Sequence, residues 1–282
     1  MARKRKPIVP MKYPVGQEYA YRKILLALTL QQKKLLKQHM APEVVGMVSE
    51  VTAVHLPTGE VRQDAGWQET LNKILLKITK DMMAPTAKAI KQAALQIGPG
   101  VNNYNKAEWQ RLIRQQYAVD PTREHPTKYQ YVLNNWSQNN AMLIKDIPTR
   151  SMKQIADLTV ESLRSGKTAK DMASEIFDIM QERMDVSDSR AKLIARDQVS
   201  KLNGNLTQER QTDMGVQGYI WRTVGDERVR ETHDANNDQE FSWDIPPPET
   251  GHPGEDVNCR CWAEPILPER LMFEASLAEA EE

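Results

Sequence analysis

Apolar residues recur at helical spacing over most of the chain, and this pattern restricts the fold more than any other feature. The clearest stripe has members at i, i+4, i+7, i+8, i+11 and i+15, namely Trp67, Leu71, Ile74, Leu75, Ile78 and Met82. Such spacing places all six side chains on one face of a helix. Similar stripes follow at 87–97, 109–113, 132–147, 155–163, 172–184 and 191–206. The first 215 residues therefore predict a succession of helices whose stripes form a core.

Breaker residues and capping residues separate these stripes and predict where the helices end. Proline and glycine interrupt a helix, whereas Ser or Thr followed by an acid can open one. The expected breaks are at Pro85, at "GPG" from Gly98, at "DPT" from Asp120, at Pro148 and at Gly166. Thr168 with Asp171 predicts a capping box, and Ser187 is expected to cap the last long helix.

The composition changes at Gly215, where "GVQGYIWRT" predicts a strand that leaves a turn. From Val224 onward the chain is rich in Pro, Gly, Asn and Asp, so its order must come from packing or cross-linking. We therefore expect an α+β fold that is mostly α-helical, with short strands near the C-terminus. The expected parts are a basic helical region at 1–125, a module at 126–267 and an acidic tail at 268–282.

Composition excludes several classes of protein. Hydrophobic residues make up 40% of the chain and charged residues 27%, which is typical of a folded protein. The longest apolar run, residues 24–30, is far shorter than the ~20 residues that span a bilayer. The basic N-terminus lacks the apolar segment of a secretory signal. We therefore expect folding in a cytoplasm, where two cysteines stay thiols or metal ligands.

Charge is distributed unevenly although the formal net charge is zero. Residues 1–40 carry ten Lys or Arg against one acid, whereas residues 233–282 carry thirteen acids against two arginines. Such a basic segment suits phosphate or an acidic protein surface, although both ends could also simply be solvated. The candidate contact residues are Arg3, Lys4, Arg5, Lys6, Arg22, Lys23, Lys33 and Lys34.

Two histidines and two cysteines near the C-terminus could hold a metal. His233, His252, Cys259 and Cys261 offer two imidazoles and two thiolates, which suit a structural zinc ion. Cys-x-Cys is tighter than the spacing of common zinc sites, but in a strand both side chains would share one face. The other interpretation is that two buried thiols pack as small apolar groups.

A catalytic interpretation is also open. In "RETHDANND", His233 could act as a base while Asp234 or Asp238 holds a divalent cation, as in a metal-dependent nuclease. The same residues also form turns. No Gly-x-Ser-x-Gly, Walker loop or Rossmann fingerprint is found, so we predict no catalytic residues and no enzyme.

Taken together, "GYIWRTVGDERVRETHD" and "HPGEDVNCRCW" are more specific than any of their parts. They resemble the C-terminal module of the Mu F-like minor head proteins, the phage head morphogenesis family. "NNWSQNNAMLIKDIP" and "RAKLIARDQVSKLNGN" are similar to this family too. The matching motif residues are Trp221, Thr223, Asp226, Arg228, Val229, Arg230, His233, Pro253, Gly254, Asp256, Asn258, Cys259, Arg260 and Cys261.

The motif residues fit an architectural role. Asp226 could pin the loop through Arg228 and Arg230, while Arg260 would point away from the cysteines to stack on Trp262 or reach a carboxylate. Pro253 and Gly254 are expected to set a tight turn before a last strand. The module would then be a compact cap closed by its own C-terminal strand.

The resemblance implies a minor capsid protein of a tailed phage, inside the head near the portal, assembled in the host cytoplasm. It would assist head assembly, DNA packaging or DNA ejection. The implied partners are the portal protein, other head proteins and packaged double-stranded DNA, with no membrane. A nuclease or effector enzyme that uses His233 and an assembly factor absent from the mature virion are the competing hypotheses.

Overall fold

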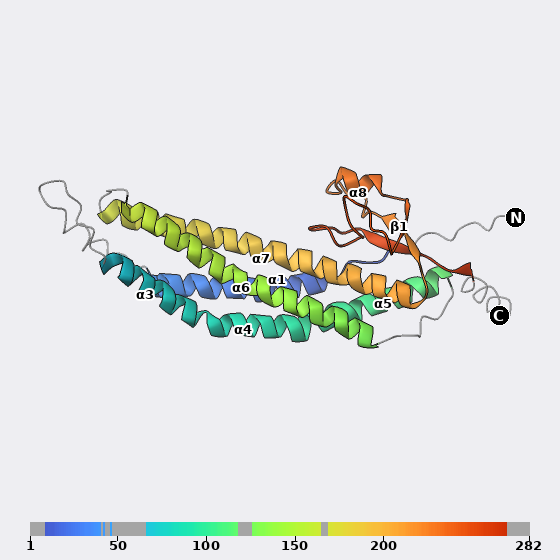
Figure 1. The fold of residues 1–282 in the computed structure, drawn as a ribbon, viewed down its shortest axis with the longest axis horizontal. Helices are drawn as coiled ribbons and strands as arrows, with labels where there is room; N and C mark the ends of the chain where they lie inside the picture. The colour runs from blue at the N-terminus through green and yellow to red at the C-terminus, as the bar shows by residue number, and fades with distance from the viewer. Residues whose placement is uncertain are drawn as a thin grey trace, which may run out of the picture. The chain divides into compact units, whose positions relative to one another are not determined.

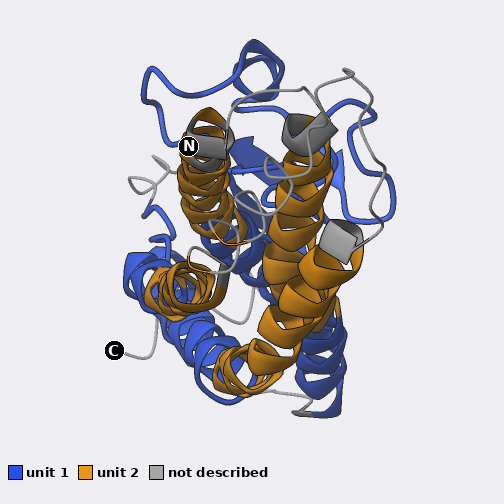
Figure 2. Cartoon of the chain, turned by 90° about the vertical axis from the view of Figure 1, so that its left-hand side faces the viewer, with its two compact units in different colours: residues 1–21, 94–138, 195–282 blue, residues 22–93, 139–194 orange. Residues whose placement is uncertain are grey.

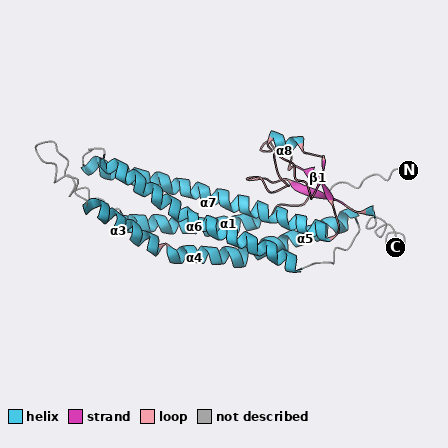
Figure 3. Ribbon diagram, in the orientation of Figure 1, coloured by secondary structure: helices cyan, strands magenta, loops and turns pink. Residues whose placement is uncertain are grey.

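The computed structural model describes residues 9–40, 66–117, 126–164 and 169–269, together with residues 42 and 46. Most of this part is helical, and strands occur only near its C-terminal end (Figures 1 and 3). The helices are α1 (Val15–Leu35), η1 (Leu36–Met40), α3 (Gly66–Asp81), α4 (Met83–Gln92), η2 (Ala93–Ile97), α5 (Gly98–Tyr117), α6 (Pro126–Arg164), α7 (Ala169–Asp213) and α8 (Glu231–Ala235). The predicted mostly α-helical α+β fold is confirmed.

The chain forms two compact units that interleave in sequence (Figure 2). One unit comprises residues 1–21, 94–138 and 195–282, and the other comprises residues 22–93 and 139–194. Segments far apart in the chain thus contribute to each core. The predicted boundaries at 125/126 and 267/268 remain predictions.

The unit of residues 22–93 and 139–194 is helical and is held by the predicted stripes. Leu25, Ile78, Ile144 and Ile155 are fully buried in it. The stripe predicted from Trp67 to Met82 corresponds to α3, in which Leu71 and Ile74 are also buried. Its helices form because apolar residues at a period near 3.6 can be buried together.

Two predicted helix ends are wrong in this unit. Pro148 lies inside α6, and Ser187 lies inside α7. Gln32 Nε2 donates to the Pro148 carbonyl at 3.2 Å, and the neighbouring Ile147 is fully buried. Ser187 Oγ bonds the Ser151 hydroxyl and donates to Arg183 O. Because packing stabilises the helix on both sides of each residue, the local stop signal does not decide the structure.

The break expected near Pro85 is present but falls a few residues earlier, whereas the stop expected at Gly98 is absent. α3 ends at Asp81, and Pro85 lies in the first turn of α4, where the missing N–H of proline costs least. The "GPG" segment begins α5 directly after η2 instead of stopping the chain. A Cβ on Gly98 would approach the Trp136 ring to 3.2 Å, so this glycine permits a close helix contact.

The three strands form one antiparallel sheet with the order β2-β1-β3. They are β1 (Gly218–Arg222), β2 (Glu240–Ser242) and β3 (Trp262–Ile266). β1 confirms the strand predicted in "GVQGYIWRT". β1 pairs with β3 from Gly218 opposite Ile266 to Arg222 opposite Trp262, so the last strand closes the sheet.

A buried aromatic cluster joins this sheet to α7 within the unit of residues 1–21, 94–138 and 195–282. Tyr219 and Trp221 of β1 pack with Trp243 and Ala263. Gln211 of α7 donates to Ala263 O at 2.8 Å and accepts from Trp243 Nε1 at 3.0 Å. The C-terminal half of α7 therefore fixes the sheet through both packing and hydrogen bonds.

Several predicted features lie outside the described residues. These are Arg3 to Lys6, Asp120, Gly166, Thr168 and most of the acidic tail, since the described part ends at residue 269. Among the described helices, none is long and apolar enough to cross a membrane.

Candidate functional site

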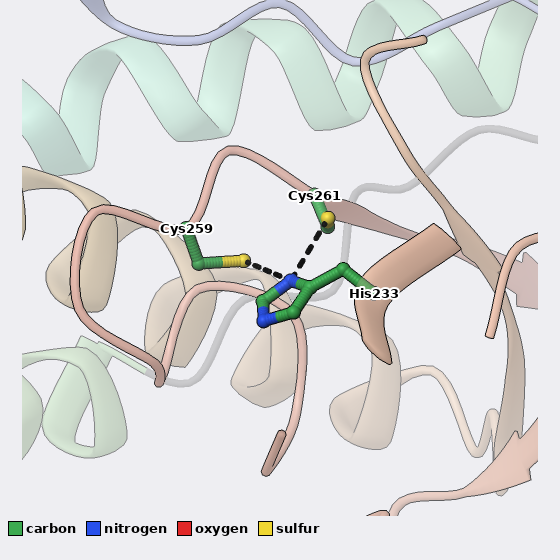
Figure 4. A group of neighbouring side chains, drawn as sticks. All are labelled: His233, Cys259 and Cys261. Carbon is green, nitrogen blue, oxygen red and sulfur yellow. Dashed lines mark hydrogen bonds between the residues drawn. The ribbon is translucent and has the colours of Figure 1, made fainter. Parts of the chain in front are cut away.

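His233, Cys259 and Cys261 gather at one point beside the sheet (Figure 4). His233 belongs to α8, while both cysteines lie in the extended segment directly before β3. Nδ1 of His233 is 3.4 Å from Cys261 Sγ and 3.6 Å from Cys259 Sγ. In a strand the two cysteines would share one face, as considered from the sequence. In the structure they converge on one imidazole from a segment without strand pairing.

The opposite side of the His233 ring is held by charged neighbours. Asp256 Oδ2 lies 3.0 Å from Nε2, and Arg230 in turn donates to Asp256 and to Val257 O. Trp221 meets the imidazole edge to face, with 5.5 Å between ring centroids. These contacts fix the ring orientation, so that Nδ1 faces the two sulfur atoms.

The three side chains influence one another's protonation. Hydrogen bonds from Cys261 and His233 lower the pKa of Cys259 to about 5, despite its burial. The hydrogen bond with Cys259, aided by Asp256, raises the pKa of His233 above its usual value. The bond to Cys259 also raises the pKa of Cys261. A thiolate beside an imidazole is a metal-binding arrangement, while Cys259, only 4% exposed, is poorly accessible as a nucleophile.

Helix α7 contacts the segment that carries Cys259 and Cys261 and helps to hold it in place. Ser200 Oγ donates to Cys259 O, and Gly254 N donates to Cys259 Sγ at 3.3 Å. Gly204 of α7 and the Pro253–Gly254 turn touch backbone to backbone, since a Cβ on Gly204 would lie 2.6 Å from Pro253 O. The expected turn at Pro253 and Gly254 is thus present, and its left-handed Gly254, with φ of 97°, sits against the helix.

The loop after β1 is pinned by a partner other than those expected. Asp226 accepts from Arg260 Nη2 at 2.7 Å and from the backbone N–H of Arg228, and the hydrogen bond from Arg260 lowers the pKa of this carboxyl. Arg230 instead pairs with Asp256. Arg260 thus reaches a carboxylate, which is one of the two roles considered for it.

His252 does not join the three-residue group. Its Nδ1 lies 2.9 Å from the Tyr219 hydroxyl, and its ring packs against Trp243 at 4.9 Å between centroids. Burial lowers the pKa of His252. The structure therefore assembles three of the four predicted metal ligands and uses His252 within the aromatic core.

The lowered pKa of His252 predicts a pH effect. Because the unfolded chain takes up this proton more readily, acidification from about pH 7.5 to 5.5 should favour unfolding. A His252→Gln variant should lose less stability than the wild type over this interval. Urea unfolding at both pH values measures the difference, and parallel losses in the two proteins would contradict the assignment.

A solvent-open hollow of about 530 Å³ adjoins the group. Its lining includes His233, both cysteines and four arginines, Arg196, Arg228, Arg230 and Arg260. Asn258, with φ of 57°, also lines it. The Asn258 Oδ1 atom is buried and has no hydrogen-bond partner within the described part of the chain.

The predicted basic contact residues lie elsewhere. Arg22, Lys23 and Lys34 are exposed on α1, and Lys33 is half-buried there. Arg3, Lys4, Arg5 and Lys6 fall outside the described residues.

Sequence reasoning gave no role to three residues that shape the site, namely Asp256, Ser200 and Gly204. Asp256 was visible as part of the motif, but its pairing with His233 was not. A glycine near the end of the apolar stripe of residues 191–206 was the available signal for a close contact at Gly204.

The chain thus combines long helices with a small α+β module in which one histidine and two cysteines lie close together. Residues 153–264 match the model of the family described as phage Mu protein F like protein. The resemblance predicted from the sequence is thereby confirmed for the matched segment.

The match extends beyond the module in one curated relative. An uncharacterized protein of Haemophilus influenzae is 32% identical over 241 residues, which cover 82% of this chain and 52% of the relative. The chain thus spans about half the length of that relative. No solved structure matches.

Proposed function

We propose that the chain is a minor head protein of a tailed bacteriophage, located inside the capsid near the portal. There it assists head assembly, DNA packaging or DNA ejection. The observation that carries this proposal is the match of residues 153–264 to the phage Mu protein F like family.

The geometry of the motif supports an architectural role over an enzymatic one. His233 is only 3% exposed, and its two ring nitrogens face Asp256 and the cysteines. Asp238 pairs with Arg222. The nuclease considered would need His233 accessible beside a cation held by Asp234 or Asp238. Among the described residues, neither carboxylate is grouped with His233 as a possible metal ligand.

The proposed partners are the portal protein, other head proteins and packaged DNA. The cations of α1 suit either phosphate or an acidic protein surface. Arg22 and Lys34 are exposed and lie on the same helix as Lys23 and Lys33, so they provide several positive charges in one segment.

Purified, nuclease-treated virions of the phage or prophage that encodes the chain provide the test. Quantitative mass spectrometry should detect the protein at a few copies per portal ring. Cross-linking in the same particles should join residues 1–40 to the portal or to DNA, which distinguishes the two partners.

Precursor heads are the necessary comparison. If the protein is present in precursor heads but absent from mature virions, the structural role fails and a transient assembly factor replaces it. If it is absent from both particles, the assembly role fails as well.

A further inference from the structure

The positions of three ligand atoms point to a specific metal. Tetrahedral zinc has bonds of about 2.3 Å to sulfur and 2.0–2.1 Å to nitrogen, which places neighbouring nitrogen and sulfur ligands about 3.5 Å apart. In the structure, Nδ1 of His233 is 3.4 Å from one sulfur and 3.6 Å from the other. All three ligand atoms lie within 4.8 Å of one another. Both nitrogen–sulfur distances therefore match those of a tetrahedral zinc site.

The surroundings of His233 prepare it as a ligand. A metal-binding imidazole commonly gives its second N–H to a carboxylate, which sets the tautomer. Asp256 stands 3.0 Å from Nε2 in that position, and the Arg230 guanidinium pairs with Asp256. Nδ1 then faces the two sulfur atoms, to which dashed lines join it in Figure 4.

Hydrogen bonds also fix the position of one of the sulfur ligands, Cys259. Gly254 N donates to Cys259 Sγ, and Ser200 holds the carbonyl of the same residue. Both contacts come from segments outside the cysteine pair, so the position of Cys259 does not depend on the metal alone. Two sulfur ligands and one imidazole favour zinc over the hard, oxygen-seeking cations.

We propose that His233, Cys259 and Cys261 bind one zinc ion that ties α8 to the segment before β3. All three ligand residues also line the hollow, together with Arg196, Arg228 and Arg260. The ion thereby holds together the two ends of a long loop that contains only a short helix and a short strand.

Metal analysis of the full-length chain, purified under reducing conditions without chelator, tests this proposal. We expect one zinc ion per chain by inductively coupled plasma mass spectrometry. Adding Zn²⁺ to protein from which a chelator has removed the metal should raise Tm by roughly 5–10 °C. This shift is expected when the concentration of free ligand is about 100 times its Kd.

A matched pair of variants separates ligation from folding. His233→Gln should lose the zinc, whereas His252→Gln should retain it, although both histidines are buried. Titration of the chelated wild type with Co²⁺ gives a readout that needs no variant. Binding should produce the intense visible bands of a tetrahedral ion and a thiolate-to-cobalt charge-transfer band.

The proposal is overturned if the wild type carries no zinc and shows neither the Tm shift nor the cobalt spectrum. It is also overturned if the intact mass under non-reducing conditions shows that Cys259 and Cys261 form a disulfide in the native protein. Neither result depends on where the protein resides in the virion, so the proposed function is tested separately.

Discussion

Replacing Gly204 with alanine is expected to destabilise the protein by about 2–3 kcal/mol. Inside a helix, alanine is normally more stable than glycine by up to ~1 kcal/mol, so the expected effect is opposite to helix propensity. The added Cβ would lie 2.6 Å from Pro253 O and 3.3 Å from Gly254 Cα. Both neighbours are backbone atoms, which cannot rotate away as a flexible side chain can. Helix α7 and the 253–254 turn must therefore separate.

The turn cannot retreat at low cost because its other contacts are equally close. A Cβ on Gly254 would already lie 3.0 Å from Ser200 O. The same turn positions the N–H that donates to Cys259 Sγ. Gly204→Ala should therefore disturb the cysteine corner as well as lower the free energy of unfolding.

Gly16→Ala in α1 is the matched control, because nothing lies within 4 Å of its Cβ position. It should be neutral or slightly stabilising. Urea unfolding of both variants and the wild type gives the comparison. Equal stability of Gly204→Ala and Gly16→Ala would show that α7 and the turn do not pack as closely as the structure indicates.

The presence of the helices could be predicted from the sequence, because side chains that are buried on one face of a helix must recur at the helical period. The stripe from Trp67 to Met82 became α3, and the aromatic segment around Trp221 became β1. The ends at Pro148 and Ser187 could not be predicted. A breaker signal is local and costs a few kcal/mol, and contacts from distant segments such as Gln32 and Ser151 can offset it.

The site shows the same division between local pattern and tertiary contact. The motif predicted that His233, Cys259 and Cys261 matter together, and the structure brings them together. Spacing alone could not exclude His252, because its separation from the cysteines is compatible with ligation. Its exclusion depends on Tyr219 and Trp243, which lie on other segments of the sheet region.

Asn105→Ala is expected to lower the free energy of unfolding by about 3 kcal/mol, because it removes acceptors and donors around a buried charge. Asn105 is fully buried, and Arg210 is only 2% exposed. Asn105 Oδ1 accepts from Arg210 Nη1 at 2.7 Å, while its Nδ2 donates to Thr207 Oγ1 at 2.8 Å. The amide thus connects α5 to two turns of α7.

The remaining contacts of Arg210 do not replace this acceptor. Asn102 Oδ1 accepts from Nη2 at 2.6 Å, and the guanidinium lies 4.5 Å from the centroid of the Tyr129 ring. The Leu206 carbonyl also lies near Nη1, but at 3.4 Å it is a longer and weaker acceptor than Asn105 Oδ1. A buried guanidinium that loses a charge-assisted bond is destabilised more than a neutral donor would be.

Asn103→Ala is the control that separates this effect from helix propensity. It is the same substitution on the same helix, but Asn103 is exposed. It should be neutral or stabilise slightly, because alanine is the better helix former. Chemical unfolding of the two variants isolates the buried network. A difference between them below about 1 kcal/mol would mean that Arg210 finds another acceptor, and that α5 and α7 are joined mainly by their apolar contacts.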